Sequence, residues 1–114
     1  MTSNVISFRQ LNMHKAAAAS AELNIALNDS LQIALVTEPY TAHNKVVSIP
    51  QGYKAFPSTP LETTPRAAVI FPNHLTITAL TNLSTADCAT VLLRANNAGL
   101  ILCSLYMDLS LIHI

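Results

Sequence analysis

One carboxylate in this sequence stands where a strand commonly presents a functional side chain. The stretch IALVTEPY places Glu38 directly after an apolar run and directly before Pro39. Because proline cannot continue strand pairing, the predicted strand ends at this carboxylate. Two interpretations follow. Glu38 is either the first solvated residue after a buried strand, which is the common case, or a metal ligand held by a rigid element.

The other reactive side chains form no pattern of their own. Cys88 and Cys103 lack CxxC spacing and have no histidine nearby at ligand spacing. We therefore expect two buried apolar thiols rather than a zinc site. His14, His43 and His74 fall in turns or loops at irregular spacing, so we interpret them as ordinary surface histidines.

The composition indicates one folded domain, or part of one. The chain has 114 residues, of which 51% are hydrophobic and 11% charged, which argues against disorder and favours segments buried on both faces. Six basic and six acidic residues leave no net charge, so the overall charge gives no indication of a DNA-binding surface. Lys15 and Arg66 could touch a nucleic-acid backbone, but two scattered cations do not form a basic stripe.

Signals for secretion and for membrane insertion are missing from the sequence. The first fifteen residues, MTSNVISFRQLNMHK, contain no uninterrupted apolar segment of the kind found in signal peptides. The apolar tail from Leu100 to Ile114 is interrupted by Asp108 and is too short to span a bilayer. We expect an intracellular protein, nuclear or cytoplasmic, that is not secreted and has no membrane partner.

The first part of the chain predicts a βαβ unit. Val5–Asn12 and Gln32–Thr37 are rich in apolar residues and are predicted to be strands. Between them, HKAAAASAELNIALNDS predicts a helix that ends in the turn-forming residues Asn28–Ser30. A strand, a helix and a second strand in this order favour two parallel strands.

The second part predicts a long loop followed by strands alone. Pro39–Pro65 is rich in Pro, Gly, Thr and Ser, and we expect a functional loop that holds one short strand around Tyr53–Phe56. Four strands follow, with turns at Pro72-Asn73 and Asn96–Gly99: Ala67–Phe71, Leu75–Leu80, Cys88–Ala95 and Leu100–Tyr106.

A single helix leaves a sheet face uncovered in this set of elements. We therefore expect the chain to be part of a larger fold. The last six residues, LSLIHI, look like read-through of a sequencing adapter, so residues 109–114 are interpreted as a non-native tail and residues 1–108 as the native part. Nothing is inferred from His113.

Four segments together resemble a known family. RQLNMHK, IALVTEPY, RAAVIFPN and LILCSLYMD are similar, in order and at plausible intervals, to the N-terminal half of the endonuclease/exonuclease/phosphatase family. Within it, they look most like the apurinic-type endonuclease domain that precedes the reverse transcriptase of non-LTR retrotransposons. The resemblance implies an α/β fold, namely part of a four-layered α/β sandwich in which a βαβ unit is followed by mainly antiparallel strands.

The resemblance also implies an activity and its residues. Phosphodiester hydrolysis needs a nucleophilic water and charge stabilisation on the phosphoryl oxygens, which a hard divalent ion held by carboxylates supplies in part. The implied cofactor is Mg²⁺, or Mn²⁺ in its place, with Glu38 as its ligand. Asn12 and Tyr106 are the implied catalytic residues, Asn12 orienting the metal ligand or a phosphate oxygen and Tyr106 reaching the scissile phosphate.

Each of the two catalytic residues also has an ordinary structural interpretation. Asn12 could cap the helix that follows it. Tyr106 could be a tyrosine at a strand end with a buried ring and a solvated hydroxyl group.

Two later motifs of the family have no counterpart in the chain. Its Asp-x-Asn motif supplies the general base, and its Ser-Asp-His motif activates or holds the phosphate; Asp29, Asp87 and Asp108 fit neither pattern. We expect this chain to be an inactive fragment of an endonuclease whose partners are DNA and, in the same polypeptide, a reverse transcriptase. The alternatives are a non-catalytic α/β interaction module and a phosphatase-type member of the family.

Overall fold

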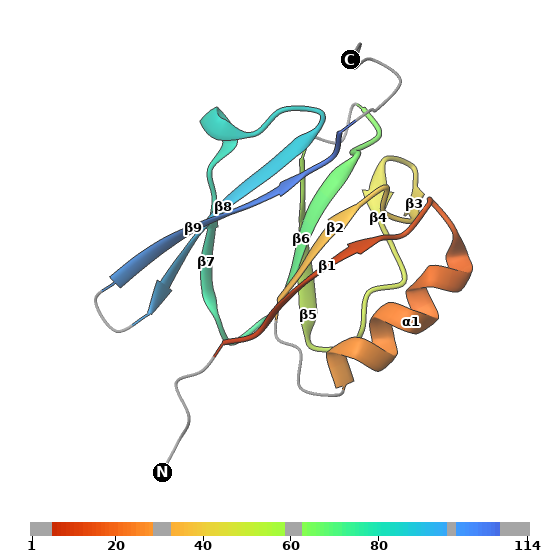
Figure 1. The fold of residues 1–114 in the computed structure, drawn as a ribbon, viewed down its shortest axis with the longest axis horizontal. Coiled ribbons are helices and arrows are strands. Elements are labelled where there is room, and N and C mark those ends of the chain that lie inside the picture. The colour runs from red at the N-terminus through yellow and green to blue at the C-terminus, as the bar shows by residue number, and fades with distance from the viewer. Residues whose placement is uncertain (1–5, 29–32, 59–62, 96–97, 108–114) are drawn as a thin grey trace.

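The computed structural model describes residues 6–28, 33–58, 63–95 and 98–107. Its elements, in chain order, are β1 (Phe8–Asn12), α1 (Ala17–Asn28), β2 (Ile33–Thr37), β3 (Thr41–Ala42), β4 (Lys45–Val46), β5 (Tyr53–Pro57), β6 (Ala67–Pro72), β7 (Thr76–Ala79), the 3₁₀ turn η1 (Thr81–Leu83), β8 (Cys88–Ala95) and β9 (Ala98–Leu105). Figure 1 shows the arrangement.

The first sheet contains four strands in the order β1-β2-β6-β5. β1 and β2 pair in parallel, joined by α1, while β6 runs antiparallel to both β2 and β5. This arrangement confirms the predicted βαβ unit and the change to antiparallel pairing after it.

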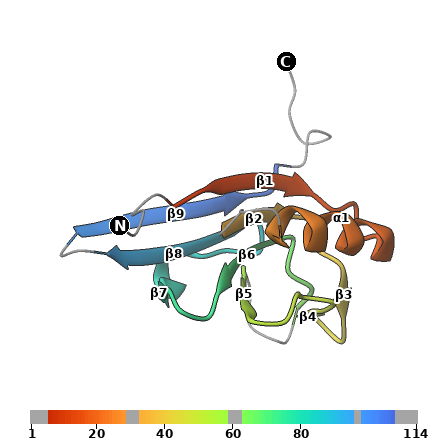
Figure 2. The same ribbon diagram turned by 90° about the horizontal axis from the view of Figure 1, so that it is seen from below.

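The second sheet, β7-β8-β9, is antiparallel and packs against the first. Figure 2 shows β1 and β9 along one side of the resulting sandwich, with β5 and β7 along the other. The residues of β6 alternate between two cores. Val69 and Phe71 pack toward β8 with Val91, whereas Ile70 packs toward α1 with Leu23.

The described residues therefore form three layers: one helix and two sheets. The predicted α/β fold class is confirmed, and these layers correspond to part of the expected four-layered sandwich.

The helix buries a face that its repeat pattern did not identify. Leu23 and Ser20 are buried, whereas Ile25, which continues the four-residue spacing of Ala17 and Ala21, is 67% exposed. Alanine occurs on every face of α1, so the sequence marks no single apolar stripe.

The long segment after β2 holds more structure than predicted. Besides β5, which confirms the expected short strand, β3 and β4 form a hairpin. His43 and Asn44 at its turn have φ of 53° and 63°, as a two-residue type I′ turn requires. The prediction of a loop with one strand was therefore incomplete, because strands of two residues show no periodicity.

The prediction of two buried thiols was wrong. Cys88 is half-buried and Cys103 is exposed, because the side of β9 that faces away from the first sheet is not covered by the described residues. Partial desolvation of its sulfur and the neighbouring Cys88 thiol raise the pKa of the Cys103 thiol, although the residue as a whole is exposed. Ile101, on the same face of the strand, is 59% exposed.

Several predicted features lie wholly or partly outside the described residues. They are the start of the first strand at Val5, the turn at Asn28–Ser30, the start of the second strand at Gln32, the turn at Asn96–Gly99 and the tail at 109–114. In the described ranges, no helix combines the length and the apolar character needed to cross a membrane.

Candidate active site

Strand register brings the ends of β1, β2 and β6 together. Asn12, the last residue of β1, pairs with Thr37, the last residue of β2, and Thr37 pairs on its other side with Ala67, the first residue of β6. Glu38 follows Thr37 directly, and Arg66 precedes Ala67. Asn12, Glu38 and Arg66 therefore lie at one end of the first sheet.

The backbone of Glu38 adopts a conformation that is unusual for its residue type. Its φ is 47°, in the left-handed region that a side chain with a Cβ disfavours. Two hydrogen bonds hold it there: the Glu38 N–H donates to the Arg66 carbonyl at 2.9 Å, and the Lys15 N–H donates to the Glu38 carbonyl at 2.8 Å. Pro39 is fully buried behind it. The surrounding structure thus fixes a strained residue, as is common at functional sites.

Asn12 shapes the turn that leads into the helix. Its Oδ1 accepts a hydrogen bond from the His14 N–H at 2.8 Å. His14 and Lys15 have φ of 51° and 56°, and the turn is anchored by Met13, which is 1% exposed. Because α1 begins only at Ala17, Asn12 stabilises the preceding turn rather than capping the helix.

The same turn brings a histidine to the carboxylate. Nδ1 of His14 lies 3.6 Å from Oε2 of Glu38, and the two side chains are 76% and 22% exposed. Within the described residues, His14, His43 and His74 are all exposed, as predicted. His14 nevertheless contacts the candidate metal ligand, so this pair forms an ion pair when the imidazole is protonated.

Tyr106 reaches the site from the second sheet. It follows β9 directly, and its N–H donates to the Asp87 carbonyl at 2.7 Å. The Arg66 guanidinium lies 5.7 Å from the centre of its ring, within cation–π range. Nε of Arg66 also lies 2.6 Å from Oδ1 of Asp87. The Arg66–Asp87 pair therefore contacts Tyr106 on one sheet and Glu38 on the other.

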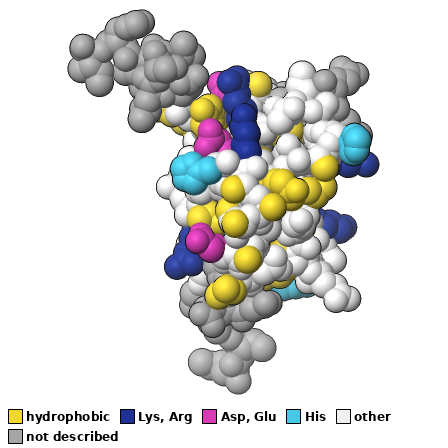
Figure 3. All heavy atoms as spheres, turned by 90° about the vertical axis from the view of Figure 1, so that its right-hand side faces the viewer, with side chains coloured by type: hydrophobic (Ala, Val, Ile, Leu, Met, Phe, Trp, Pro, Cys, Tyr) yellow, Lys and Arg dark blue, Asp and Glu magenta, His cyan; other side chains and the backbone are white. Residues whose placement is uncertain are grey.

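The predicted site residues thus converge, although they come from three separate segments. Asn12, Glu38 and Tyr106 all stand at the strand ends described above. Figure 3 shows acidic, basic and histidine side chains next to one another toward the top of one face of the molecule.

A groove lies between the two sheets beside Asn12. It has a volume of about 260 Å³ and is lined by residues of β1, β2 and β9: Gln10, Leu11, Asn12, Leu35, Thr37 and Leu105. It places a polar strand end next to an open space, as a substrate-binding surface requires.

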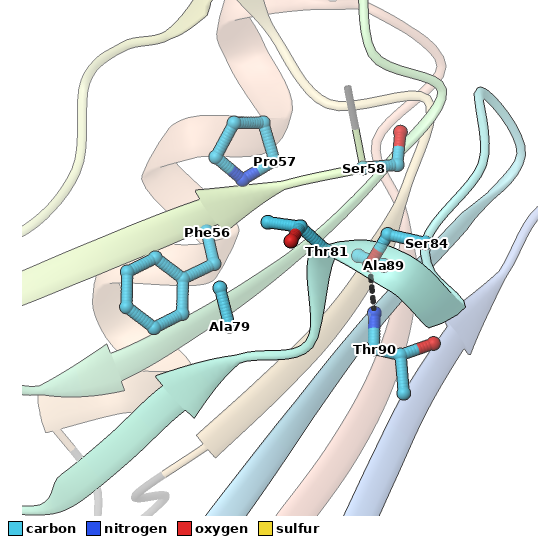
Figure 4. Close-up of a pocket in the computed structure, with 8 residues that line it drawn as sticks. All are labelled: Phe56, Pro57, Ser58, Ala79, Thr81, Ser84, Ala89 and Thr90. Carbon is cyan, nitrogen blue, oxygen red and sulfur yellow. Dashed lines mark hydrogen bonds between the residues drawn. The ribbon is translucent and has the colours of Figure 1, made fainter. Parts of the chain in front are cut away.

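A larger pocket of about 480 Å³ lies on the β5–β7 side of the sandwich (Figure 4). It is mainly apolar, and a hydrogen bond from the Thr90 N–H to Ser84 Oγ at 3.1 Å closes part of its wall. Asn12, Glu38 and Tyr106 are not among its lining residues, so it is separate from the candidate site.

The donors at the site suit a hard cation in part. Among the described residues, no group of three or more His, Cys, Asp or Glu side chains could enclose a metal ion. Mg²⁺ does not need such a cage, since it keeps several waters and is often held by one or two carboxylates together with substrate phosphates. Glu38, with its side chain partly exposed and its backbone fixed, fits that kind of ligand.

Comparison with solved structures identifies a similar protein. The chain superposes on the endonuclease domain of TRAS1, a telomere-specific non-LTR retrotransposon, with a TM-score of 0.72 and 28% sequence identity over 87% of its own length. The chain has a fold similar to part of this retrotransposon endonuclease domain. The resemblance inferred from the four sequence segments is confirmed. No protein-family model and no curated protein matches the chain.

The similarity covers only part of the retrotransposon endonuclease domain. The chain spans 43% of the TRAS1 domain, which is less than half of it.

Sequence reasoning missed two residues at this site. Arg66 was considered only as a scattered cation and Asp87 only as an aspartate outside the known motifs, yet they pair beside Tyr106. Each immediately precedes a strand, Arg66 before β6 and Asp87 before β8. A charged residue directly before an apolar strand was the available signal for each residue, whereas Glu38 was identified from its place directly after one.

Proposed function

We propose that this chain is the N-terminal part of a Mg²⁺-dependent DNA endonuclease domain of a non-LTR retrotransposon. The observation that carries the proposal is the convergence of Asn12, Glu38 and Tyr106 at one end of a fold similar to a retrotransposon endonuclease domain. In this proposal the partners are DNA and a reverse transcriptase in the same polypeptide.

Each residue has a role in the proposed reaction. Glu38 would hold Mg²⁺ through its partly exposed carboxylate, and the bound ion would supply positive charge to the phosphate. Asn12 keeps the turn beside Glu38 in shape through its Oδ1, while its amide NH₂ group can donate to a phosphate oxygen. The Tyr106 hydroxyl group donates to the same phosphate from the second sheet.

Two motifs that cleavage would need are absent from the 114 residues. The Asp-x-Asn and Ser-Asp-His motifs, which would supply a general base and a further phosphate contact, do not occur in the 114 residues. We therefore propose that the 114 residues bind metal but do not cleave DNA, and that cleavage belongs to a longer protein that contains them.

The test is plasmid nicking by the natural protein that carries this chain. Glu38→Gln keeps the size of the side chain and removes its charge, so we expect Mg²⁺-dependent nicking to fall by at least about 100-fold. Chelation of the metal should abolish nicking by the unchanged protein. Glu22→Gln, which alters an exposed carboxylate on α1, is the matched control and should nick normally.

Three outcomes would contradict the proposal. Nicking at the normal rate by Glu38→Gln would make Glu38 a solvated strand-end residue. A natural protein that hydrolyses phosphomonoesters but leaves DNA intact would favour the phosphatase alternative, and one without either activity would favour the interaction module.

A further inference from the structure

The pair formed by Arg66 and Asp87 joins the two sheets at the candidate site. Arg66 precedes β6 of the first sheet, and Asp87 precedes β8 of the second. Their side chains meet at 2.6 Å, and the Arg66 N–H donates to the carbonyl of Ala86, the neighbour of Asp87, at 3.3 Å. A side-chain contact and a backbone hydrogen bond thus link the same two loops.

Each member of the pair also holds a residue of the site through its backbone. The Arg66 carbonyl accepts the N–H of Glu38 at 2.9 Å, and the Asp87 carbonyl accepts the N–H of Tyr106 at 2.7 Å. A continuous path of short contacts therefore runs from Glu38 through Arg66 and Asp87 to Tyr106. The Arg66 guanidinium closes this path by lying over the Tyr106 ring.

Stability alone does not account for this pair. Both side chains are 42% exposed, and ion pairs that are open to solvent contribute little to the free energy of unfolding. The contact is one close approach between Nε of Arg66 and Oδ1 of Asp87, a buried oxygen that has no hydrogen bond among the described residues. The guanidinium also lies over the Tyr106 ring, so the pair is distinguished by its place between the two sheets rather than by its strength.

We propose that Arg66 and Asp87 are positioning residues that fix the separation between Glu38 and Tyr106 across the two sheets. This inference rests on the proposed function, in which Glu38 and Tyr106 act on one phosphate. It assigns the pair an indirect role, since neither side chain needs to touch the substrate.

The first test measures local order by amide hydrogen exchange in the natural protein that carries this chain. Arg66→Gln removes both the contact with Asp87 and the contact with the Tyr106 ring. We expect exchange at Glu38 and Tyr106 to become roughly tenfold faster, with no change at the buried strand residues Ala34 and Val69. Faster exchange throughout the protein would indicate a general structural role and overturn the inference, as would no change anywhere.

Further variants test the chemistry of the pair. Asp87→Asn should speed exchange at the same two amides. The double variant should be no worse than Arg66→Gln alone, because that change already breaks the contact with Asp87. Arg66→Lys keeps a cation but lacks the planar guanidinium, so it should restore the protection only in part. Arg94→Gln, which changes an exposed arginine of β8, is the matched control and should leave exchange unaltered.

The second test separates positioning from direct DNA binding. Misplaced catalytic groups lower kcat, so Arg66→Gln should reduce kcat for nicking by roughly 10- to 100-fold with little change in KM. A raised KM with unchanged kcat would make Arg66 a phosphate contact and overturn the inference.

The two tests also distinguish this inference from the proposed function. If the unchanged protein never nicks DNA, the proposed function fails, while the exchange data still decide whether the pair orders Glu38 and Tyr106. If the unchanged protein nicks DNA and the Arg66→Gln variant matches it in both tests, the positioning role is wrong while the proposed function stands.

Discussion

At the scale of single residues, Glu38 combines the side chain of a proposed metal ligand with a strained backbone. Its left-handed φ is held by hydrogen bonds to Arg66 and Lys15 and by the buried Pro39 beside it. Sequence reasoning identified Glu38 from its place after an apolar run, but not its conformation, because that depends on two loops distant in sequence.

The strain at Glu38 predicts an unusual response to substitution. Glycine adopts a φ of 47° without steric cost, whereas alanine does not. Glu38→Gly should therefore be more stable than Glu38→Ala by about 1 kcal/mol, although glycine usually destabilises. Urea denaturation of the two variants measures this difference. Greater stability of the alanine variant would mean that the left-handed conformation is absent in solution.

At the scale of elements, the two sheets are joined by a buried polar contact as well as by apolar packing. Ser104 of β9 is 1% exposed, and its Oγ donates to the Val36 carbonyl of β2 at 2.7 Å. The contact is near the C-terminal ends of both strands, close to Glu38 and Tyr106. It therefore helps to set how the sheets meet where the site lies.

Removing this contact should destabilise the protein measurably. Ser104→Ala loses a buried hydrogen bond while keeping nearly the same volume, so we expect the free energy of unfolding to fall by about 1 kcal/mol. Ser7→Ala, at an exposed position before β1, is the control and should change it by less than about 0.5 kcal/mol. Chemical denaturation checks both values, and equal values for the two variants would exclude a stabilising role for Ser104.

At the scale of the whole molecule, the sequence predicted the layers better than their details. Apolar runs predicted the strands that form the core, and the alanine-rich segment predicted α1. The sequence did not identify the buried face of α1, because alanine lies on every side of the helix. It also did not predict the β3–β4 hairpin, because strands of two residues carry no periodic signal. The contact between Arg66 and Asp87 could not be predicted from the sequence for another reason, because it forms only when the two sheets pack together.

The uncovered side of the second sheet has a consequence for solubility. Ile101 is 59% exposed on β9, an edge strand of its sheet, and exposed apolar edges promote association. We predict that the 114-residue chain is poorly soluble alone and that Ile101→Lys raises its soluble fraction severalfold. Ile25→Lys, at an exposed position on α1, should not. Light scattering at matched concentrations compares them, and equal improvement would point to added charge alone.

The hydrogen bonds that hold Glu38 come from segments on either side of the β3–β4 hairpin, in Lys15 and Arg66. The hairpin itself begins just after the buried Pro39 and projects from the same end of the sheet (Figure 1). Val46 of β4 packs against the core that contains Met13, whereas Ala42 and His43 at the tip of the hairpin are exposed. Substitutions at this exposed tip should therefore alter the surroundings of the candidate site, while the hydrogen bonds from Lys15 and Arg66 keep the Glu38 backbone in place.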